Sequence, residues 1–166
     1  SKGIVSTKGG TVNNEGTIAM TGGSAGIDAT GGTVNNKAGA SITTSAASNA
    51  NGINVTSGTT SGAEAATVIN DGTITINGNG DGINSKMSSS SPAGTLNLLT
   101  NNGTITVNGS GRGIFADAAN INNTSAARIN VGGSGYGIRS ASGTITNDGT
   151  ITVNGTNGIG ASTGGT

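Results

Sequence analysis

Residues 101–116 read Asn-Asn-Gly-Thr-Ile-Thr-Val-Asn-Gly-Ser-Gly-Arg-Gly-Ile-Phe-Ala, and the chain repeats this segment along its length. Near copies occupy Asn70–Ser85 and, slightly shortened, Asn147–Ala161, with weaker copies between them. Self-similarity at a period of about 20–50 residues indicates a solenoid, in which each repeat buries its apolar side chains against the next.

The dipeptide Gly-Ile marks each repeat. Successive Gly-Ile pairs are 23, 26, 30, 31, 24 and 21 residues apart, so the chain holds six periods that average about 26 residues. The isoleucines of these pairs are Ile4, Ile27, Ile53, Ile83, Ile114, Ile138 and Ile159.

Each period contains two further apolar positions. The first holds Val12, Val34, Val68, Leu99, Ile121 and Ile145, and the second holds Ile18, Ile42, Ile74, Ile105, Ile129 and Ile151.

Around the second apolar position, apolar and polar residues alternate. An apolar residue usually follows two positions later, as Val107 follows Ile105, with Thr44 as the exception. Alternation with a period of two is typical of strands, and threonine suits the outward sites between. No window has the apolar spacing of an amphipathic helix, and the frequent Gly and Asn disfavour helices. We therefore predict three short strands per repeat.

Three strands per repeat predict an all-β fold, a right-handed single-stranded parallel β-helix (β-solenoid) of about six coils, each of 21–31 residues. At ~4.8 Å per coil the rod is about 30 Å long. Its narrow core needs few apolar residues, in keeping with only 29 Leu, Ile, Val and Phe among 166. We expect one domain over residues 1–166. We also expect a fragment of a longer protein, because the chain begins inside the repeat pattern.

Asparagine follows the first apolar strand of every repeat, as Asn14, Asn36, Asn70, Asn101, Asn123 and Asn147. Asn tolerates the left-handed backbone of a tight turn. Its stacked amides can also form a hydrogen-bonded ladder along the axis. Both roles place these residues at equivalent corners of successive coils.

The composition excludes several classes of function. Seven basic and seven acidic residues leave no net charge and no basic patch, so we expect no nucleic-acid partner. No apolar run approaches the ~20 residues of a membrane helix, so we expect no membrane insertion. Cysteine and histidine are absent, which removes thiolate ligands and the commonest zinc ligand. We predict no metal and no cofactor.

Two inserted loops, at about 56–66 and 86–95, interrupt the same corner of successive coils. Insertions in solenoids tend to collect on a functional face, although neutral variation in a tolerant loop explains them equally simply. If they bind a partner, the candidate contacts are Ser57, Thr59, Glu64, Lys86, Met87 and Ser89.

A second candidate site lies around the Gly-Ile pairs. In register, Arg112 falls between Asp81 and Tyr136, and Phe115 falls beside Arg139. Ion pairing and cation–π contact would follow, each worth only ~0.5–1 kcal/mol on a surface. Phe115 and Tyr136 are the only aromatic residues of the chain. This contact patch is either a binding spot for a glycan or protein or a structural side-chain ladder.

Enzymatic and ice-binding activities have weaker support. A polysaccharide-active enzyme needs converging carboxylates, whereas Asp71 and Asp148 should lie roughly 14 Å apart, at one coil spacing per step. We therefore predict that the chain is not an enzyme. The repeated Thr-Ile-Thr strands resemble the ice-binding face of antifreeze solenoids, but Ala19 and the segment 128–130 break that pattern.

The repeats Asn70–Ile83, Asn101–Ile114 and Asn147–Ile159 resemble the passenger domains of Gram-negative autotransporter adhesins, which are secreted by the type V route. The haemagglutinin-like exoproteins of two-partner secretion are similar. The resemblance covers essentially the whole chain and brings no catalytic residues.

This resemblance implies a segment at the bacterial cell surface, exported across the outer membrane, that attaches to host cells, to other bacteria or to itself. A host or bacterial surface protein or a glycan would be its partner. The main alternative is a structural stalk that holds a distal binding tip. Open sheet edges also predict end-to-end contacts of an excised segment.

Overall fold

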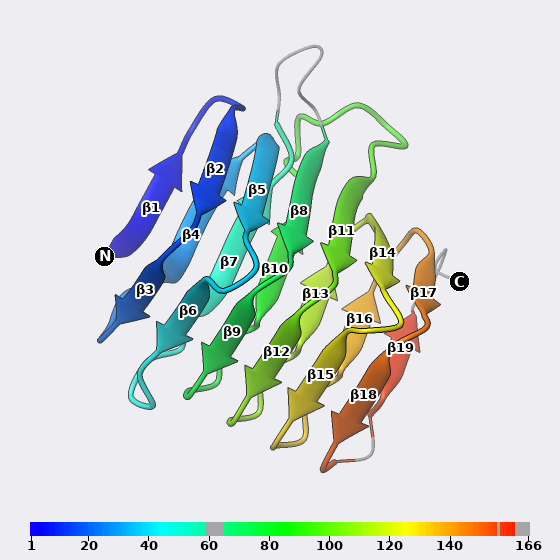
Figure 1. Cartoon of the computed structure of the whole chain (residues 1–166). Coiled ribbons are helices and arrows are strands. Elements are labelled where there is room, and N and C mark those ends of the chain that lie inside the picture. The colour runs from blue at the N-terminus through cyan, green and yellow to red at the C-terminus, as the bar shows by residue number, and fades with distance from the viewer. Residues whose placement is uncertain (59–64, 156, 162–166) are drawn as a thin grey trace.

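The computed structural model describes residues 1–58, 65–155 and 157–161, and this part of the chain forms nineteen β-strands without a helix. The strands build three parallel sheets that wind into a right-handed parallel β-helix with three strands per coil. Figure 1 shows the coils stacked as a rod, with the N-terminal coil at one end and the C-terminal coil at the other. The predicted fold is confirmed.

Each sheet takes one strand from every coil. Sheet A contains β1 (Lys2–Ser6), β4 (Ala25–Thr30), β7 (Asn51–Thr56), β10 (Ile83–Lys86), β13 (Ile114–Ala116), β16 (Ile138–Ser140) and β19 (Ile159–Ala161). Sheet B contains β2 (Thr11–Asn14), β5 (Gly32–Asn36), β8 (Ala66–Asn70), β11 (Asn97–Asn101), β14 (Ala119–Asn123) and β17 (Ile145–Asn147). Sheet C contains β3 (Thr17–Met20), β6 (Ser41–Thr44), β9 (Thr73–Ile76), β12 (Thr104–Val107), β15 (Arg128–Val131) and β18 (Thr150–Val153).

The three apolar positions of the repeat stack in register, as predicted. The Gly-Ile isoleucines pair strand by strand through sheet A. The first position forms a column in sheet B. The second does so in sheet C. These columns meet in one continuous core, in which Ile53, Ile74 and Leu99 are fully buried. Stacking explains how so few apolar residues suffice, because each coil covers the next.

Thr44 is the one polar residue in its inward column of sheet C, between Met20 and Ile76. Its side chain is fully buried and its hydroxyl has no hydrogen-bond partner. An unpaired buried hydroxyl is destabilising, so this position is a defect in the core.

The asparagine column forms a ladder inside the rod. Each side-chain amide nitrogen donates to the amide oxygen of the next coil over 2.7–2.8 Å, from Asn14 through to Asn147. The expectation that these asparagines adopt a left-handed turn backbone is wrong, because no described residue other than glycine has a positive φ. These residues end the sheet B strands, so amide stacking, and not backbone tolerance, accounts for the column.

The glycine of the Gly-Ile pair has a steric reason. At Gly113, a methyl group would overlap the side chain of Ile129 and the carbonyl oxygen of Gly137 in the next coil. Gly82 has the same surroundings, with Ile105 and Gly113. Sheet A therefore approaches the sheet C isoleucines too closely at this point for any side chain.

Both insertions connect sheet A to sheet B, at the same corner of successive coils, as predicted. The connections between strands are 57–65 and 87–96, so each end lies within one residue of the predicted ranges. Hydrogen bonds join their described parts. The backbone N–H of Ser88 donates to the Ser57 hydroxyl, and the Ser91 hydroxyl donates to the carbonyl of Gly58.

Candidate functional site

The predicted contact patch assembles on the outward side of sheet A. Phe115 lies in β13 and Arg139 in β16, and the register places them side by side. Asp81, Arg112 and Tyr136 lie two residues before the Gly-Ile isoleucine of their coils, at the corner that leads into sheet A. Stacked coils therefore bring five residues from three repeats together.

Asp81 and Arg112 form the predicted ion pair. The guanidinium donates from Nε to Oδ1 over 2.9 Å and from Nη2 to Oδ2 over 2.8 Å. The Arg112 backbone N–H and the Asn84 side chain donate to the same carboxylate. Asp81 is buried, so these four hydrogen bonds replace its lost hydration. The pair is a structural bridge between two coils.

The two aromatic rings contact arginines of their own coils. The Arg112 guanidinium lies 3.7 Å from the centre of the Phe115 ring, and that of Arg139 lies 5.5 Å from the centre of the Tyr136 ring. Sequence reasoning expected Phe115 to contact Arg139. The two are neighbours in register, but the ring lies under Arg112, because Asp81 holds that guanidinium in place.

Unlike Arg112, Arg139 is exposed and has no carboxylate partner within the described residues. Phe115 and Tyr136 beside it are partly exposed. The patch therefore presents one uncompensated cation next to two aromatic rings, while its buried carboxylate is already satisfied.

Asp28 forms a second charged contact on this face. Its carboxylate accepts from Asn54 of the next coil and pairs with Lys2 of the preceding one. Burial raises the pKa of Asp28, but the hydrogen bonds from Lys2 and Asn54, with the charges of Lys2 and Lys86, outweigh that effect and hold this pKa below its usual range.

The loop candidates fall into three groups: one buried residue, three that are exposed or partly exposed, and two outside the described residues. Ser57 is buried, and its hydroxyl holds the two loops together, so it is unable to contact a partner directly. Lys86 and Ser89 are exposed, and Met87 is partly exposed with its backbone N–H donating to Asp117. Thr59 and Glu64 lie outside the described residues.

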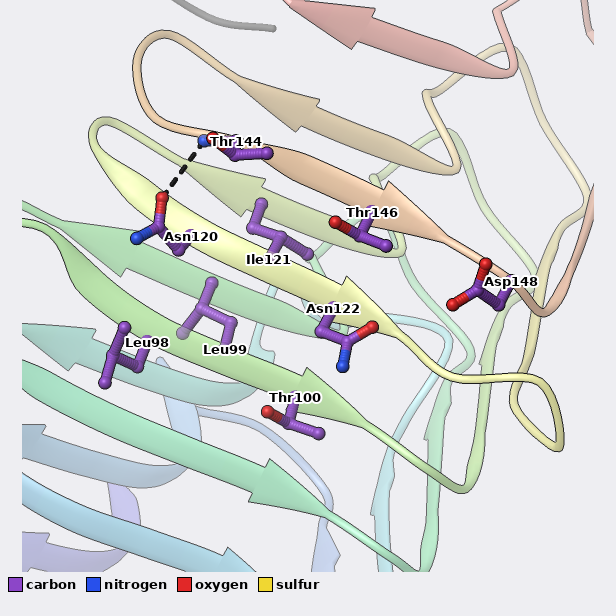
Figure 2. Close-up of a pocket in the computed structure, with 9 residues that line it drawn as sticks. All are labelled: Leu98, Leu99, Thr100, Asn120, Ile121, Asn122, Thr144, Thr146 and Asp148. Atoms are coloured by element: carbon purple, nitrogen blue, oxygen red, sulfur yellow. Dashed lines mark hydrogen bonds between the residues drawn. The ribbon is translucent and has the colours of Figure 1, made fainter.

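A groove that the sequence did not reveal lies on the outward side of sheet B (Figure 2). It has a volume of about 500 Å³ and crosses β11, β14 and β17. The lining residues are Leu98, Leu99, Thr100, Asn120, Ile121, Asn122, Thr144, Thr146 and Asp148. Leu98 carries the only signal in the sequence, since it places a large apolar side chain at a strand position expected to face water.

No three described His, Cys, Asp or Glu side chains lie close enough together to hold a metal ion. The described part of the chain also has no helix suited to crossing a membrane. Comparisons with protein-family models, curated proteins and solved structures found no match to this chain. Its function has to be argued from its own side chains.

Proposed function

We propose that this chain is an adhesive segment of a surface-exposed passenger protein of the autotransporter type. The resemblance of its repeats to such passengers motivates the proposal, and a stiff rod suits the display of contact residues away from a cell. The observation that carries it is the exposed, uncompensated Arg139 beside Phe115 and Tyr136.

The patch departs from the self-satisfying pattern of the rod. Elsewhere, outward polar side chains often pair with the next coil, as Asn108 donates to Asn77 over 2.7 Å. In the patch, Arg112 still pairs with Asp81 of the preceding coil, whereas the Arg139 guanidinium lies only over the Tyr136 ring of its own coil. Tyr and Arg are the residue types that most often dominate protein interfaces, and repeated weak contacts add up when a surface displays many copies.

Adhesion of coated beads tests the proposal. The full chain is coupled to beads, which are incubated with epithelial cells and with bacteria, and attached beads are counted against albumin-coated beads. Arg139→Gln removes the charge and keeps a polar side chain, and we expect roughly tenfold less attachment if this residue is an interface hot spot. Arg128→Gln is the matched control, since Arg128 is also exposed but lies on sheet C.

Two results would contradict the adhesive role of the patch. Equal attachment of the Arg139→Gln and Arg128→Gln beads would remove Arg139 from the contact. Attachment no greater than that of albumin for the unchanged chain would favour the structural stalk, which the unbroken core and amide ladder would serve equally well. Replacing Lys86 and Met87 by serine tests the exposed loop in the same assay.

A further inference from the structure

The groove on sheet B is separate from the patch on sheet A and has its own chemistry. Two columns of outward side chains line it across three coils. One column is Leu98, Asn120 and Thr144, and the other is Thr100, Asn122 and Thr146. Figure 2 shows the two columns side by side, with Asp148 beyond Thr146, two residues further along the chain.

Most of the polar groups in this groove are free. Asn120 accepts a hydrogen bond from the Thr144 backbone over 3.1 Å, which leaves its amide nitrogen without a partner. The side chains of Thr100, Asn122 and Thr146 make no hydrogen bond within the described residues, and neither does the Asp148 carboxylate.

The same face behaves differently nearer the N-terminus. There the outward amide of Asn35 donates to Asn13 over 2.9 Å, so the amides of neighbouring coils satisfy one another. In the groove, Asn120 has Leu98 and Thr144 as its neighbours along the column, and Asn122 has Thr100 and Thr146, so neither amide has another amide to pair with. The groove therefore offers donors and acceptors to a ligand.

Leu98 supplies the apolar part of the groove. Its side chain is 47% exposed, although it lies in the middle of the rod. The other large exposed apolar residues of the described chain, Val5 and Ile159, belong to the first and last strands of sheet A, where no further coil covers them. Leu98 has a coil on each side of it, so the absence of a neighbouring coil does not explain its exposure.

We propose that this groove binds a neutral oligosaccharide that lies along the rod axis between the two columns. Sugar hydroxyls both donate and accept hydrogen bonds, as amides and threonine hydroxyls do. The C–H face of a pyranose ring can pack on Leu98. A sugar chain laid along the axis places its rings over the side chains of successive coils, which are ~4.8 Å apart.

Charge and backbone pairing argue against other ligands. The only charged residue in the lining is Asp148, so an anionic glycan would meet a carboxylate and no cation. An extended peptide gains affinity chiefly by adding a strand to a free sheet edge. Here β11 and β14 pair with a strand on each side, so their backbones are already occupied. A peptide strand added to β17, the edge strand of sheet B, would extend the sheet beyond the groove and would not lie in it.

Nitrogen-edited NMR titration of the full chain tests the inference. The probes are cello-, malto-, laminari-, xylo- and chito-oligosaccharides, with an oligogalacturonate as the acidic comparison. We expect at least one neutral probe to cause saturable shifts confined to β11, β14 and β17, and the oligogalacturonate to bind more weakly. Asn122→Ala should raise the Kd of that probe about tenfold, the effect of losing one amide that bonds to the ligand.

Asn13→Ala is the matched control, an outward amide on the same sheet but outside the groove. Its Kd should equal that of the unchanged chain. The inference is overturned if no neutral probe causes shifts, if the shifts fall elsewhere, if Asn122→Ala leaves Kd unchanged, or if the acidic probe binds best. Bead adhesion through Arg139 is measured separately, so either proposal can fail while the other stands.

Discussion

Removing one rung of the asparagine ladder should destabilise the rod by several kcal/mol. Asn70 is fully buried, donates to Asn101 and accepts from Asn36, with both distances 2.7 Å. Asn70→Ala leaves one N–H of Asn36 and the amide oxygen of Asn101 buried without their ladder partners. Each orphaned group costs about 1–3 kcal/mol, so we expect a loss of about 2–6 kcal/mol in the free energy of unfolding.

Two further variants calibrate this value. Within the ladder Asn14 only donates, so Asn14→Ala leaves one buried ladder group, the oxygen of Asn36, without its partner. It also removes longer, partly buried hydrogen bonds to the Ser41 carbonyl and from the Gly16 backbone, so it should cost less than Asn70→Ala but more than an exposed site. Asn35→Ala removes a hydrogen bond of similar length between two side-chain amides on the outward face. Water replaces that hydrogen bond, so the free energy of unfolding should change by less than ~0.5 kcal/mol.

Urea unfolding followed by circular dichroism measures these differences. Fluorescence of Tyr136 provides a second probe, and coincident transitions establish that the stacked coils unfold as one unit. The reasoning is refuted if Asn70→Ala destabilises the chain no more than Asn35→Ala. Burial would then not increase the free-energy cost of losing a hydrogen bond between side-chain amides.

Three other changes test separate features of the rod. Thr44→Val removes the unpaired buried hydroxyl at nearly constant volume and should raise the free energy of unfolding by about 1–2 kcal/mol in urea titrations; a loss would show that the hydroxyl is satisfied. Gly113→Ala forces a methyl group against the next coil and should cost about 1–3 kcal/mol or more, seen as a lower Tm; an unchanged Tm would contradict the close approach. Because the pKa of Asp28 is lower in the folded than in the unfolded chain, its ionised form stabilises the fold above the unfolded value, and this contribution disappears as pH falls through the folded value. The stability difference between the unchanged chain and Asp28→Asn should therefore shrink as pH drops below about 4, and a constant difference would exclude the linkage.

The fold follows from the sequence because its signals repeat. The Ile105 column, the Gly-Ile pairs and the asparagines each recur at a fixed place in every coil, so one register satisfies all of them. The sequence does not show why glycine recurs before the isoleucine of each Gly-Ile pair. The steric role of Gly113 depends on Ile129 and Gly137, which approach it only after the coils stack.

The candidate site was only partly predictable. Register alone brings Arg112 beside Asp81, and that contact was foreseen. The direction of a long side chain is not set by register, so the contact of Arg112 with Phe115 was missed. The groove was missed for a related reason, because it depends on which outward side chains lack partners. Ser57 was placed on a loop surface, yet its hydroxyl is buried between the two loops.

The asparagine ladder has a direction. Every rung donates towards the C-terminal coil, and the backbone N–H of Gly16, which donates to the Asn14 oxygen, fixes this sense at the first rung. A stack built from its N-terminal end therefore presents an unfilled donor to each arriving coil, which must offer a carbonyl oxygen. An aspartate at such a position would accept from the coil before it and have nothing to donate to the coil after it. The ladder thus has a polarity, and a single aspartate would interrupt it at a chosen coil while the three sheets still joined that coil to the next.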